Sequence, residues 1–236
     1  MRAAILAGGL GTRLAPYTTV LPKPLIPIGE RPILELIIRQ LAARGFDRVD
    51  LCVAHLGELI RAYLEQSAAV PDGVEVAYHW EDEPSGTAGA IRDLGGDEEP
   101  LLVMNGDILT TLDYRELIRF HREQGAALTI AAHRKDVKIE LGVIEGEGAP
   151  VSDYIEKPTL SYEVSMGIYV YGSEAIREIP PGRFDFPDLV LALLERGMPV
   201  RKFAFDGPWF DIGTPSEHEL ASVAYGEDPE RYEPGP

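Results

Sequence analysis

Short β-forming runs alternate with stretches of helical periodicity through the first half of the chain. The apolar run Ala3–Ala7 is followed by a helical face over Ile33–Ala43, and the run Val49–Ala54 by a helical stretch over Leu56–Gln66. Such alternation predicts βα units whose strands lie parallel in one sheet. The same pattern predicts strands at Val74–His79, Leu101–Met104 and Leu128–Ala132, and helices at Thr87–Leu94 and Tyr114–Gln124.

From about Val137 the sequence pattern changes, because short predicted strands follow one another closely. They are Gly142–Ile144, Val151–Ile155 and Ile168–Tyr171, and helical patterns return at Pro187–Arg196 and Ser216–Tyr225. We expect this part to complete the same sheet. The predicted fold class is therefore α/β, a Rossmann-like, doubly wound, mostly parallel mixed sheet flanked by helices.

Neither a Pro/Ser-rich linker nor a hexapeptide β-helix repeat is present, which predicts a single domain without a C-terminal β-helix. We place that domain at residues 1–225. Residues 226–236 are polar and contain three prolines, so we expect a frayed tail.

The overall charge excludes several classes of partner. Lysines and arginines number 22 against 39 acids, a net charge of −17, which disfavours binding to nucleic acid or to an anionic membrane surface. The single cysteine, Cys52, lies in an apolar run and indicates a reducing compartment. With no membrane-span or signal-peptide pattern, we expect a cytoplasmic protein.

The first 29 residues depart from this acidic background. They contain Arg2, Arg13 and Lys23 and no acid, a net charge of +3. A basic, glycine-rich segment in an acidic protein indicates a small anionic ligand. A chance distribution of charges is the alternative.

A glycine-rich loop, Gly8-Gly9-Leu10-Gly11-Thr12-Arg13, follows the first predicted strand. Glycines at these positions allow close backbone approach to a ligand, and successive N–H groups form a cavity for an anion. The loop is no P-loop, because no Gly-Lys-Ser/Thr follows, and Leu14 replaces the third glycine of the dinucleotide fingerprint. A plain turn between strand and helix is the alternative.

Two further motifs suit phosphate and metal chemistry. Prolines on both sides of Lys23 stiffen the backbone around an ammonium group that could bind phosphate. Asp107 ends the sequence Asn105-Gly106-Asp107 at the end of a predicted strand, where ligands of open α/β sheets bind, and suits a hard cation such as Mg²⁺. A solvent-exposed lysine and an ordinary turn are the alternatives.

Two late motifs are ambiguous on their own. Asp211 precedes a helix start marked by Thr214 and Pro215, and is either a local cap or a second carboxylate for the same metal. Glu156 and Lys157 are adjacent, which is most often a surface ion pair.

The ordered set of these motifs resembles the sugar-1-phosphate nucleotidyltransferases, also called nucleotide-sugar pyrophosphorylases. The resemblance runs from Ala3 to Tyr225 and is greatest to short catalytic domains of the mannose-1-phosphate guanylyltransferase type. It implies an enzyme that joins an NTP and a sugar 1-phosphate to give an NDP-sugar and pyrophosphate. It also allows a homo-oligomer.

The resemblance assigns a role to each matching residue. Arg13 and Lys23 are implied as catalytic groups on the triphosphate and the attacking phosphate, and Asp107 and Asp211 as ligands of Mg²⁺. Nucleotide binding is implied for Leu6, Ala7, Gly8, Gly9, Gly11, Thr12, Glu81, Gly86 and Thr87. Sugar-phosphate binding is implied for Asn105, Gly142, Glu156, Lys157 and Ser165.

Glu81 bears on the choice of base. Thymidylyl members of the family have Gln five residues before the glycine that matches Gly86, whereas this chain has Glu81. A carboxylate only accepts hydrogen bonds, and guanine offers two adjacent donors where thymine or uracil has carbonyls beside its single donor. The substitution favours GTP. The alternative is that Glu81 faces solvent and backbone groups near Leu6–Gly9 choose the base.

Ser165 departs from the family, which often has Asn before the Gly-Ile-Tyr on the strand lining the sugar. Serine lacks the paired donor and acceptor of the amide, so the identity of the sugar is not transferred. The alternatives are an enzyme that uses dTTP, UTP or CTP, a cytidylyltransferase acting on phosphoalcohols, and a non-catalytic regulatory relative that binds nucleotide sugars.

Overall fold

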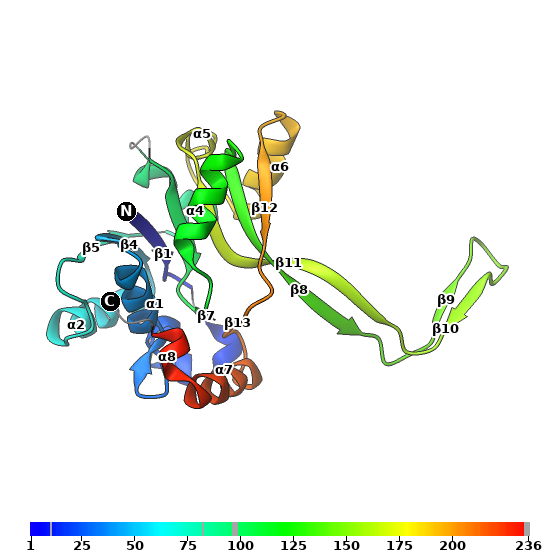
Figure 1. The fold of residues 1–236 in the computed structure, drawn as a ribbon, viewed down its shortest axis with the longest axis horizontal. Helices are drawn as coiled ribbons and strands as arrows, with labels where there is room; N and C mark the ends of the chain where they lie inside the picture. Colours follow the sequence, from blue (N-terminus) through cyan, green and yellow to red (C-terminus); the bar gives the residue numbers. More distant parts are fainter. Residues whose placement is uncertain (10, 82, 96–98, 234–236) are drawn as a thin grey trace.

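The computed structural model describes residues 1–9, 11–81, 83–95 and 99–233 (Figure 1). Its main sheet has the strand order β12-β8-β11-β6-β1-β4-β5. In chain order these strands are β1 (Arg2–Leu6), β4 (Arg48–Val53), β5 (Glu75–Trp80), β6 (Leu101–Asn105), β8 (Leu128–Lys138), β11 (Thr159–Tyr171) and β12 (Val200–Ala204).

The central strands are parallel. β1 pairs in parallel with both β4 and β6, and β4 pairs in parallel with β5. β11 runs antiparallel to β6 and β8, and β12 is parallel to β8. The predicted mixed, mostly parallel sheet is confirmed.

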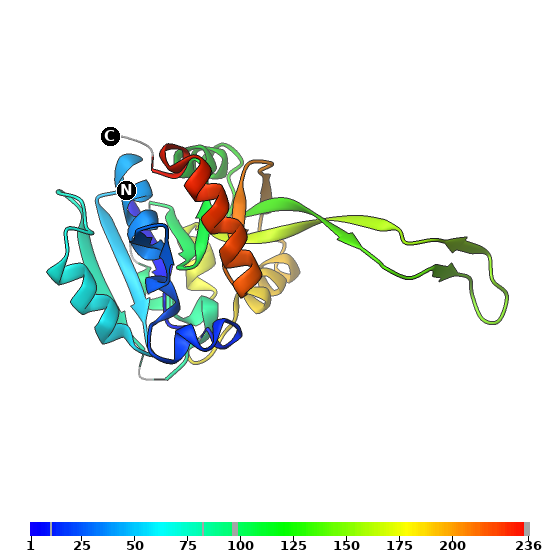
Figure 2. The same ribbon diagram turned by 90° about the horizontal axis from the view of Figure 1, so that it is seen from below.

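Helices cover both faces of this sheet (Figure 2). Along β1, Ala3 and Ile5 belong to one buried cluster and Ala4 to another, because alternate side chains of a strand point to opposite faces. The first cluster includes residues of α1 (Ile33–Ala43), α2 (Gly57–Gln66), α4 (Tyr114–Glu123), α7 (Pro215–Glu227) and α8 (Pro229–Tyr232). The second includes residues of α3 (Gly86–Gly89), α5 (Ser173–Arg177) and α6 (Phe186–Glu195).

Shorter elements complete the body. Small ladders join β2 (Pro27–Ile28) to β3 (Arg31–Pro32), and β7 (Ile108–Thr110) to β13 (Trp209–Asp211). Single 3₁₀ turns occupy Thr12–Leu14, Tyr17–Thr19, Lys23–Leu25 and Arg92–Leu94. The single helix expected over Thr87–Leu94 is therefore wrong, because α3 ends at Gly89 and a separate 3₁₀ turn follows.

A long two-stranded arm projects from the body (Figures 1 and 2). The ladder between β8 and β11 continues past a register shift near Ser165 as far as the pair Lys138–Thr159. A second hairpin, β9 (Val143–Glu145) with β10 (Asp153–Ile155), forms its tip. We expected β9 and β10 to complete the main sheet, which is wrong, because they pair only with each other. A strand pattern identifies a strand but not its partner.

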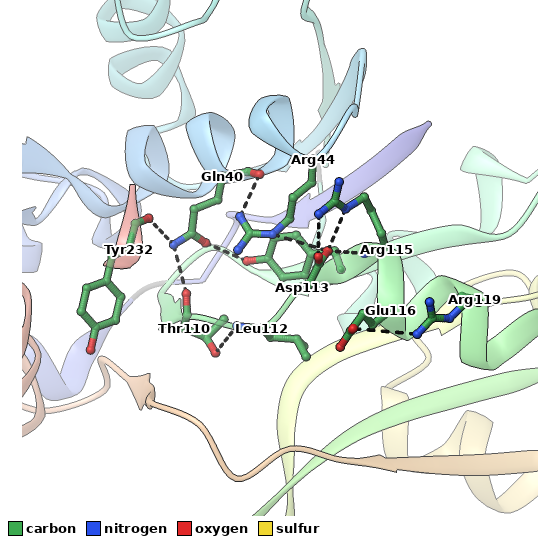
Figure 3. A network of polar contacts seen from close by, with 10 residues as sticks. Gln40, Arg44, Thr110, Leu112, Asp113, Arg115, Glu116, Arg119 and Tyr232 are labelled. Atoms are coloured by element: carbon green, nitrogen blue, oxygen red, sulfur yellow. Dashed lines mark hydrogen bonds and ion pairs between the residues drawn. The ribbon is translucent and has the colours of Figure 1, made fainter. Parts of the chain in front are cut away.

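The chain end is packed as far as the structure describes it. Residues 226–233, expected to fray, finish α7 and form α8, and Tyr232 is only 2% exposed. The Gln40 amide donates to the Tyr232 carbonyl at 2.7 Å and to the Thr110 carbonyl at 3.0 Å, and accepts from the Tyr114 hydroxyl at 2.9 Å (Figure 3). Burial of the Tyr232 ring holds this segment against the body although most of its residues are polar. The packed unit therefore extends beyond residue 225. Residues 234–236 lie outside the described part.

Candidate active site

A cavity of about 310 Å³ opens where the parallel strands end. β1, β4 and β6 each contribute a residue at or next to their carboxyl ends, namely Leu6, Cys52 and Asn105. Ligands of open α/β sheets bind at this edge. The other residues that line the cavity are Ala7, Gly8, Gly9, Lys23, Pro24, Glu81, Pro84, Gly86, Thr87, Ala90, Gly106, Asp107 and Asp185.

The glycine loop forms one side of this cavity. The Ala7 N–H donates to the Cys52 carbonyl at 2.8 Å, which ties the start of the loop to β4. Gly11 has φ +61°, and a Cβ there would lie 2.8 Å from the Thr18 methyl and 3.1 Å from the Lys23 Cβ. Glycine is therefore required at position 11 for conformation and for space. Leu10 lies outside the described residues.

Lys23 and Asp107 form an ion pair beside this loop. The Lys23 Nζ contacts the Asp107 Oδ2, and the two side chains are only 13% and 17% exposed. The other oxygen of that carboxylate, Oδ1, is buried and has no hydrogen-bond partner among the described residues. An unsatisfied carboxylate oxygen of this kind is expected where a cation or a donor binds.

Asp211 lies next to this pair. The Ile212 N–H donates to the Asp107 carbonyl at 3.0 Å, which couples the residue after β13 to the turn between β6 and β7 that carries Asp107. Burial and then the charge of Asp107 raise the pKa of the Asp211 carboxyl, while Lys23 and Arg13 act in the opposite direction. The charge of Asp107 therefore disfavours ionisation of Asp211.

Arg13, at the end of the glycine loop, lies near the group formed by Lys23, Asp107 and Asp211. A Cβ at Gly213 would lie 3.1 Å from Arg13 Nη2 and 3.2 Å from Glu217 Oε2. That Glu217 oxygen accepts from the Gly213 N–H at 3.2 Å and from the Thr214 hydroxyl at 3.0 Å. Gly213 thus leaves the space that the guanidinium occupies. Neither Gly213 nor Glu217 was predicted as a site residue from the sequence.

The aspartate pair suits a divalent cation that takes part of its shell from substrate. The part of the chain that the structure describes contains no group of three or more His, Cys, Asp or Glu side chains able to hold a metal. Two carboxylates with one unsatisfied oxygen fit Mg²⁺, which binds through one or two carboxylates plus substrate phosphates and water. Asp107 and Asp211 are the residues that would hold it.

Glu81 faces the cavity. Its N–H continues the β4–β5 edge by donating to the Val53 carbonyl at 3.0 Å. Its Oε1 accepts from the Ser85 hydroxyl and from the Ser85 N–H, while Oε2 lies 3.1 Å from the position that a Cβ on Gly8 would take. One oxygen is therefore held in place and the other is directed at the glycine loop.

Gly86 and Thr87 are positioned by a segment that the sequence analysis missed. Gly86 has φ +82°, and a Cβ there would lie 2.5 Å from the Phe184 carbonyl oxygen. The Thr87 N–H donates to Asp185 Oδ1 at 3.1 Å, and the Thr87 hydroxyl accepts from the Phe186 N–H at 2.8 Å. Asp185 lies 98 residues after Thr87 in the chain, so no local sequence signal identifies it.

Cys52 is a cavity residue without nucleophilic character. Burial, followed by the negative charge of Glu81, raises the pKa of its thiol to about 12. The group stays protonated at neutral pH, and a thiol rather than a thiolate is a poor nucleophile.

Asn105 lines the cavity, whereas the other residues assigned to the sugar phosphate do not. Gly167, with φ +73°, lets the backbone of β11 pack closely against the Asn105 side chain, because a Cβ at position 167 would lie 2.6 Å from Asn105 Nδ2. Ser165 lies at the register shift and donates to the Tyr169 hydroxyl at 3.1 Å. Gly142, Glu156 and Lys157 lie on the arm beside β9 and β10, away from the body (Figure 1).

The fold and the site together define a class of protein. An open α/β sheet presents a glycine loop, two cations and two carboxylates at its carboxyl edge, which is the arrangement of a protein that handles phosphates. A family model described as "Nucleotidyl transferase" matches residues 2–227. The chain belongs to this family, which confirms the resemblance drawn from the motifs.

The names of the curated relatives point to two different nucleotides, UTP and GTP. A UTP–glucose-1-phosphate uridylyltransferase of Synechocystis sp. is 34% identical and aligns with 90% of this chain and 60% of its own length. A mannose-1-phosphate guanyltransferase of Candida albicans is 32% identical and aligns with 95% of this chain and 64% of its own. The chain therefore spans less than two thirds of the length of these relatives.

Solved structures share the fold. HddC from Yersinia pseudotuberculosis superposes with a TM-score of 0.76 at 26% identity, over 95% of this chain and 99% of that one. A structure of the same protein complexed with GMP-PN gives a TM-score of 0.75 at 25% identity. Within the described residues, no helix combines the length and the apolar character needed to cross a membrane.

Proposed function

We propose that this chain transfers a nucleotidyl group from an NTP to a sugar 1-phosphate, giving an NDP-sugar and pyrophosphate. The observation that carries the proposal is the pair of Lys23 and Asp107 at the wall of the cavity that Gly8 and Gly9 also line, with Asp211 and Arg13 close enough to interact with that pair. Relatives named as a uridylyltransferase and a guanyltransferase of sugar 1-phosphates support this class.

In the proposed reaction, an oxygen of the sugar phosphate attacks the α-phosphorus of the NTP. A new P–O bond forms as the bond between the α-phosphorus and the bridging oxygen breaks, and the electron pair leaves with pyrophosphate. No general base is needed, because a sugar phosphate is already ionised at neutral pH. The chain contributes by positioning two polyanions and stabilising the charge that develops between them.

Lys23 is the group best placed for that stabilisation. Its ammonium lies at the cavity wall on Asp107, and an arriving phosphate would compete with the carboxylate for it. Arg13, beside Gly213, would hold the departing pyrophosphate, since a planar guanidinium binds two phosphate oxygens at once.

The acidic side chains near the cavity explain why a metal is expected. Asp107 and Asp211 offset the charges of Lys23 and Arg13, and Glu81 and Asp185 add further negative charge at the wall. A triphosphate is repelled by such a site unless a cation lies between. When bound, Mg²⁺ would neutralise and orient the triphosphate there.

For the base we propose guanine, read by Glu81. The oxygen directed at the Gly8 side of the cavity can accept from the adjacent N1–H and N2–H₂ donors of guanine. The guanyltransferase relative and the HddC complex with GMP-PN support this choice. UTP is the second candidate, because a relative with 34% identity is named as a uridylyltransferase.

For binding of the sugar phosphate we propose Asn105, because it is the residue assigned to the sugar phosphate that lines the cavity. Ser165 lies on the neighbouring strand, β11. The assignment of Gly142, Glu156 and Lys157 stays a prediction. It requires these residues of the arm to approach the cavity, and none of the three is among the residues that line it.

The test is a screen of pyrophosphate release. Purified protein is incubated with ATP, GTP, CTP, UTP or dTTP, each against a panel of sugar 1-phosphates, with and without Mg²⁺. We expect release only when an NTP, a sugar 1-phosphate and Mg²⁺ are all present, and fastest with GTP. Release without a sugar phosphate, or none with any pair, would refute the proposed reaction.

A further inference from the structure

The arm, residues 133–165, is unusually apolar for a segment that contacts the body at its base, through His133 with Phe205 and Glu163 with Lys202. Eight of its large hydrophobic side chains are exposed, from 38% at Ile155 to 74% at Leu141. They are Val137, Leu141, Ile144, Val151, Tyr154, Ile155, Leu160 and Tyr162. A two-stranded ribbon is marginally stable in water by itself, and a concentration of exposed apolar groups marks an interaction surface.

The shaft of the arm, residues 133–139 and 157–165, has two different faces. The ladder pairs Val137 with Leu160 and Lys135 with Tyr162, so these side chains share one face. Lys138 pairs with Thr159, Asp136 with Ser161 and Arg134 with Glu163 on the other. The first face also carries His133, paired with Val164, and is apolar apart from His133 and Lys135, whereas the second face is polar.

Charge is divided along the arm. The tip, residues 140–156, contains five acids and no lysine or arginine: Glu140, Glu145, Glu147, Asp153 and Glu156. The shaft contains four bases, Arg134, Lys135, Lys138 and Lys157, and two acids, Asp136 and Glu163. The tip is therefore strongly negative and the shaft positive.

The tip also contains an unfavourable pair. Glu145 lies directly opposite Asp153 in the β9–β10 ladder. Like charges at directly opposed positions of a ladder destabilise it unless a cation lies nearby. A positively charged group beside Glu145 and Asp153 would relieve this repulsion, and the shaft of a second copy of the chain carries such groups.

We propose that the arm is a dimerisation surface whose partner is the arm of a second copy, running antiparallel to it about a two-fold axis. In this arrangement each tip lies along the other shaft. The carboxylates of Glu145 and Asp153 then meet Lys135 of the second copy, and the apolar faces cover each other. A two-fold axis makes every contact twice, so weak surface pairs act together.

The test uses charge reversal in two separate chains. Sedimentation velocity of the wild type over a range of concentrations should show a dimer. Lys135→Glu lowers the net charge of the shaft from +2 to 0 and places a carboxylate opposite the Glu145–Asp153 pair of the second copy, and Asp153→Lys places a second ammonium group opposite Lys135. Each variant alone should dimerise about 10- to 100-fold more weakly, since each loses the local charge attraction at two symmetry-related contacts.

Mixing the two variants gives the decisive result. The reversed charge of Lys135→Glu now meets the reversed charge of Asp153→Lys, and the unaltered tip meets the unaltered shaft, so a heterodimer should form at near wild-type affinity. Arg119→Glu and Glu219→Lys, exposed reversals on α4 and α7, are matched controls and should dimerise as the wild type does. Unchanged circular dichroism and melting temperature show that all variants fold.

Three results would overturn the proposal: a wild type that stays monomeric at all concentrations, a dimer that Lys135→Glu and Asp153→Lys leave intact, and a mixture that fails to associate. The measurement needs no substrate. Its outcome is therefore independent of the nucleotidyl transfer proposed for the cavity.

Discussion

The body and the arm use the same strand β8 in two different ways. Within the body, Leu128 and Ala131 are completely buried between helices on both faces of the sheet. Past Ala132 the strand leaves the sheet, and Val137 is 44% exposed with only β11 beside it. Backbone pairing continues across this boundary, whereas side-chain packing stops there.

The candidate site follows the same division. The residues that line or adjoin the cavity, such as Lys23, Asp107 and Glu81, are held by packed strand ends and by hydrogen bonds from the body. Glu156 and Lys157 have no such support, because they belong to the arm. Packing on both faces positions a functional group, and strand pairing alone does not.

The strongest test of this contrast replaces one leucine in each region. Leu36 of α1 is fully buried, so Leu36→Ala should cost about 2–5 kcal/mol of unfolding free energy. Leu160→Ala on the arm should cost less than about 1 kcal/mol, measured at a concentration at which the protein is monomeric. Urea denaturation checks both, and equal costs would mean that the arm packs against the body in solution.

Lys23→Ala should abolish most of the activity. Removing a preorganised charge next to the reacting phosphates lowers kcat by about 10²- to 10³-fold, with a smaller change in KM for the NTP. Steady-state pyrophosphate release measures both constants. Lys202→Ala, which removes an exposed lysine on β12, should leave both unchanged. A normal kcat in Lys23→Ala would reduce Lys23 to a structural partner of Asp107.

Asp107→Asn and Asp211→Asn test whether the two carboxylates act on one ion. Each should raise the Mg²⁺ concentration needed for half-maximal rate and lower kcat/KM by about 10- to 100-fold. The double variant should lose much less than the product of the single losses, because both remove the same ion. Losses that multiply would show that the aspartates do not share a metal.

Glu81→Gln should change the preference among bases. The amide adds a donor that a pyrimidine carbonyl accepts and leaves one guanine donor unpaired, a cost of about 1–3 kcal/mol. The ratio of kcat/KM for GTP to that for UTP should therefore fall by about 10- to 100-fold. Glu83→Gln, an exposed neighbour, is the matched control. A wild type that prefers UTP or dTTP, or an unaltered ratio, would contradict the role of Glu81.

The smallest expected effect is a gain in stability on losing a functional group. The pKa of Asp211 is raised in the folded protein by burial and by Asp107, so its ionised form destabilises the fold at neutral pH. Asp211→Asn should raise Tm by about 2 °C at pH 7, although it lowers activity. The gain should vanish as the pH falls through the raised pKa, because the folded wild type is then protonated. A lower Tm at pH 7 would show that Asp211 stabilises the fold through Lys23 and Arg13.

Several features of the site were predictable because local sequence encodes them. Gly11 and Gly86 are required by positive φ and by close contacts, and both stand in recognisable loops. Asp185 and Glu217 were not predictable, since each acts on a group that folding brings near from elsewhere in the chain. Tyr232 was missed because a single buried ring is invisible in the composition of a polar tail.

The α/β class, the doubly wound core and the identity of the loops at its edge could be read from the amino-acid sequence, because hydrophobic periodicity, glycine placement and charge are local properties. Tertiary structure alone decided which strands pair and which side chains meet. The ladder of β8 with β11 continues beyond the core, and so Gly142, Glu156 and Lys157 were carried outward while Arg13 and Asp211 were brought together. Strand partners are chosen by packing across the whole chain, and no local pattern contains that information.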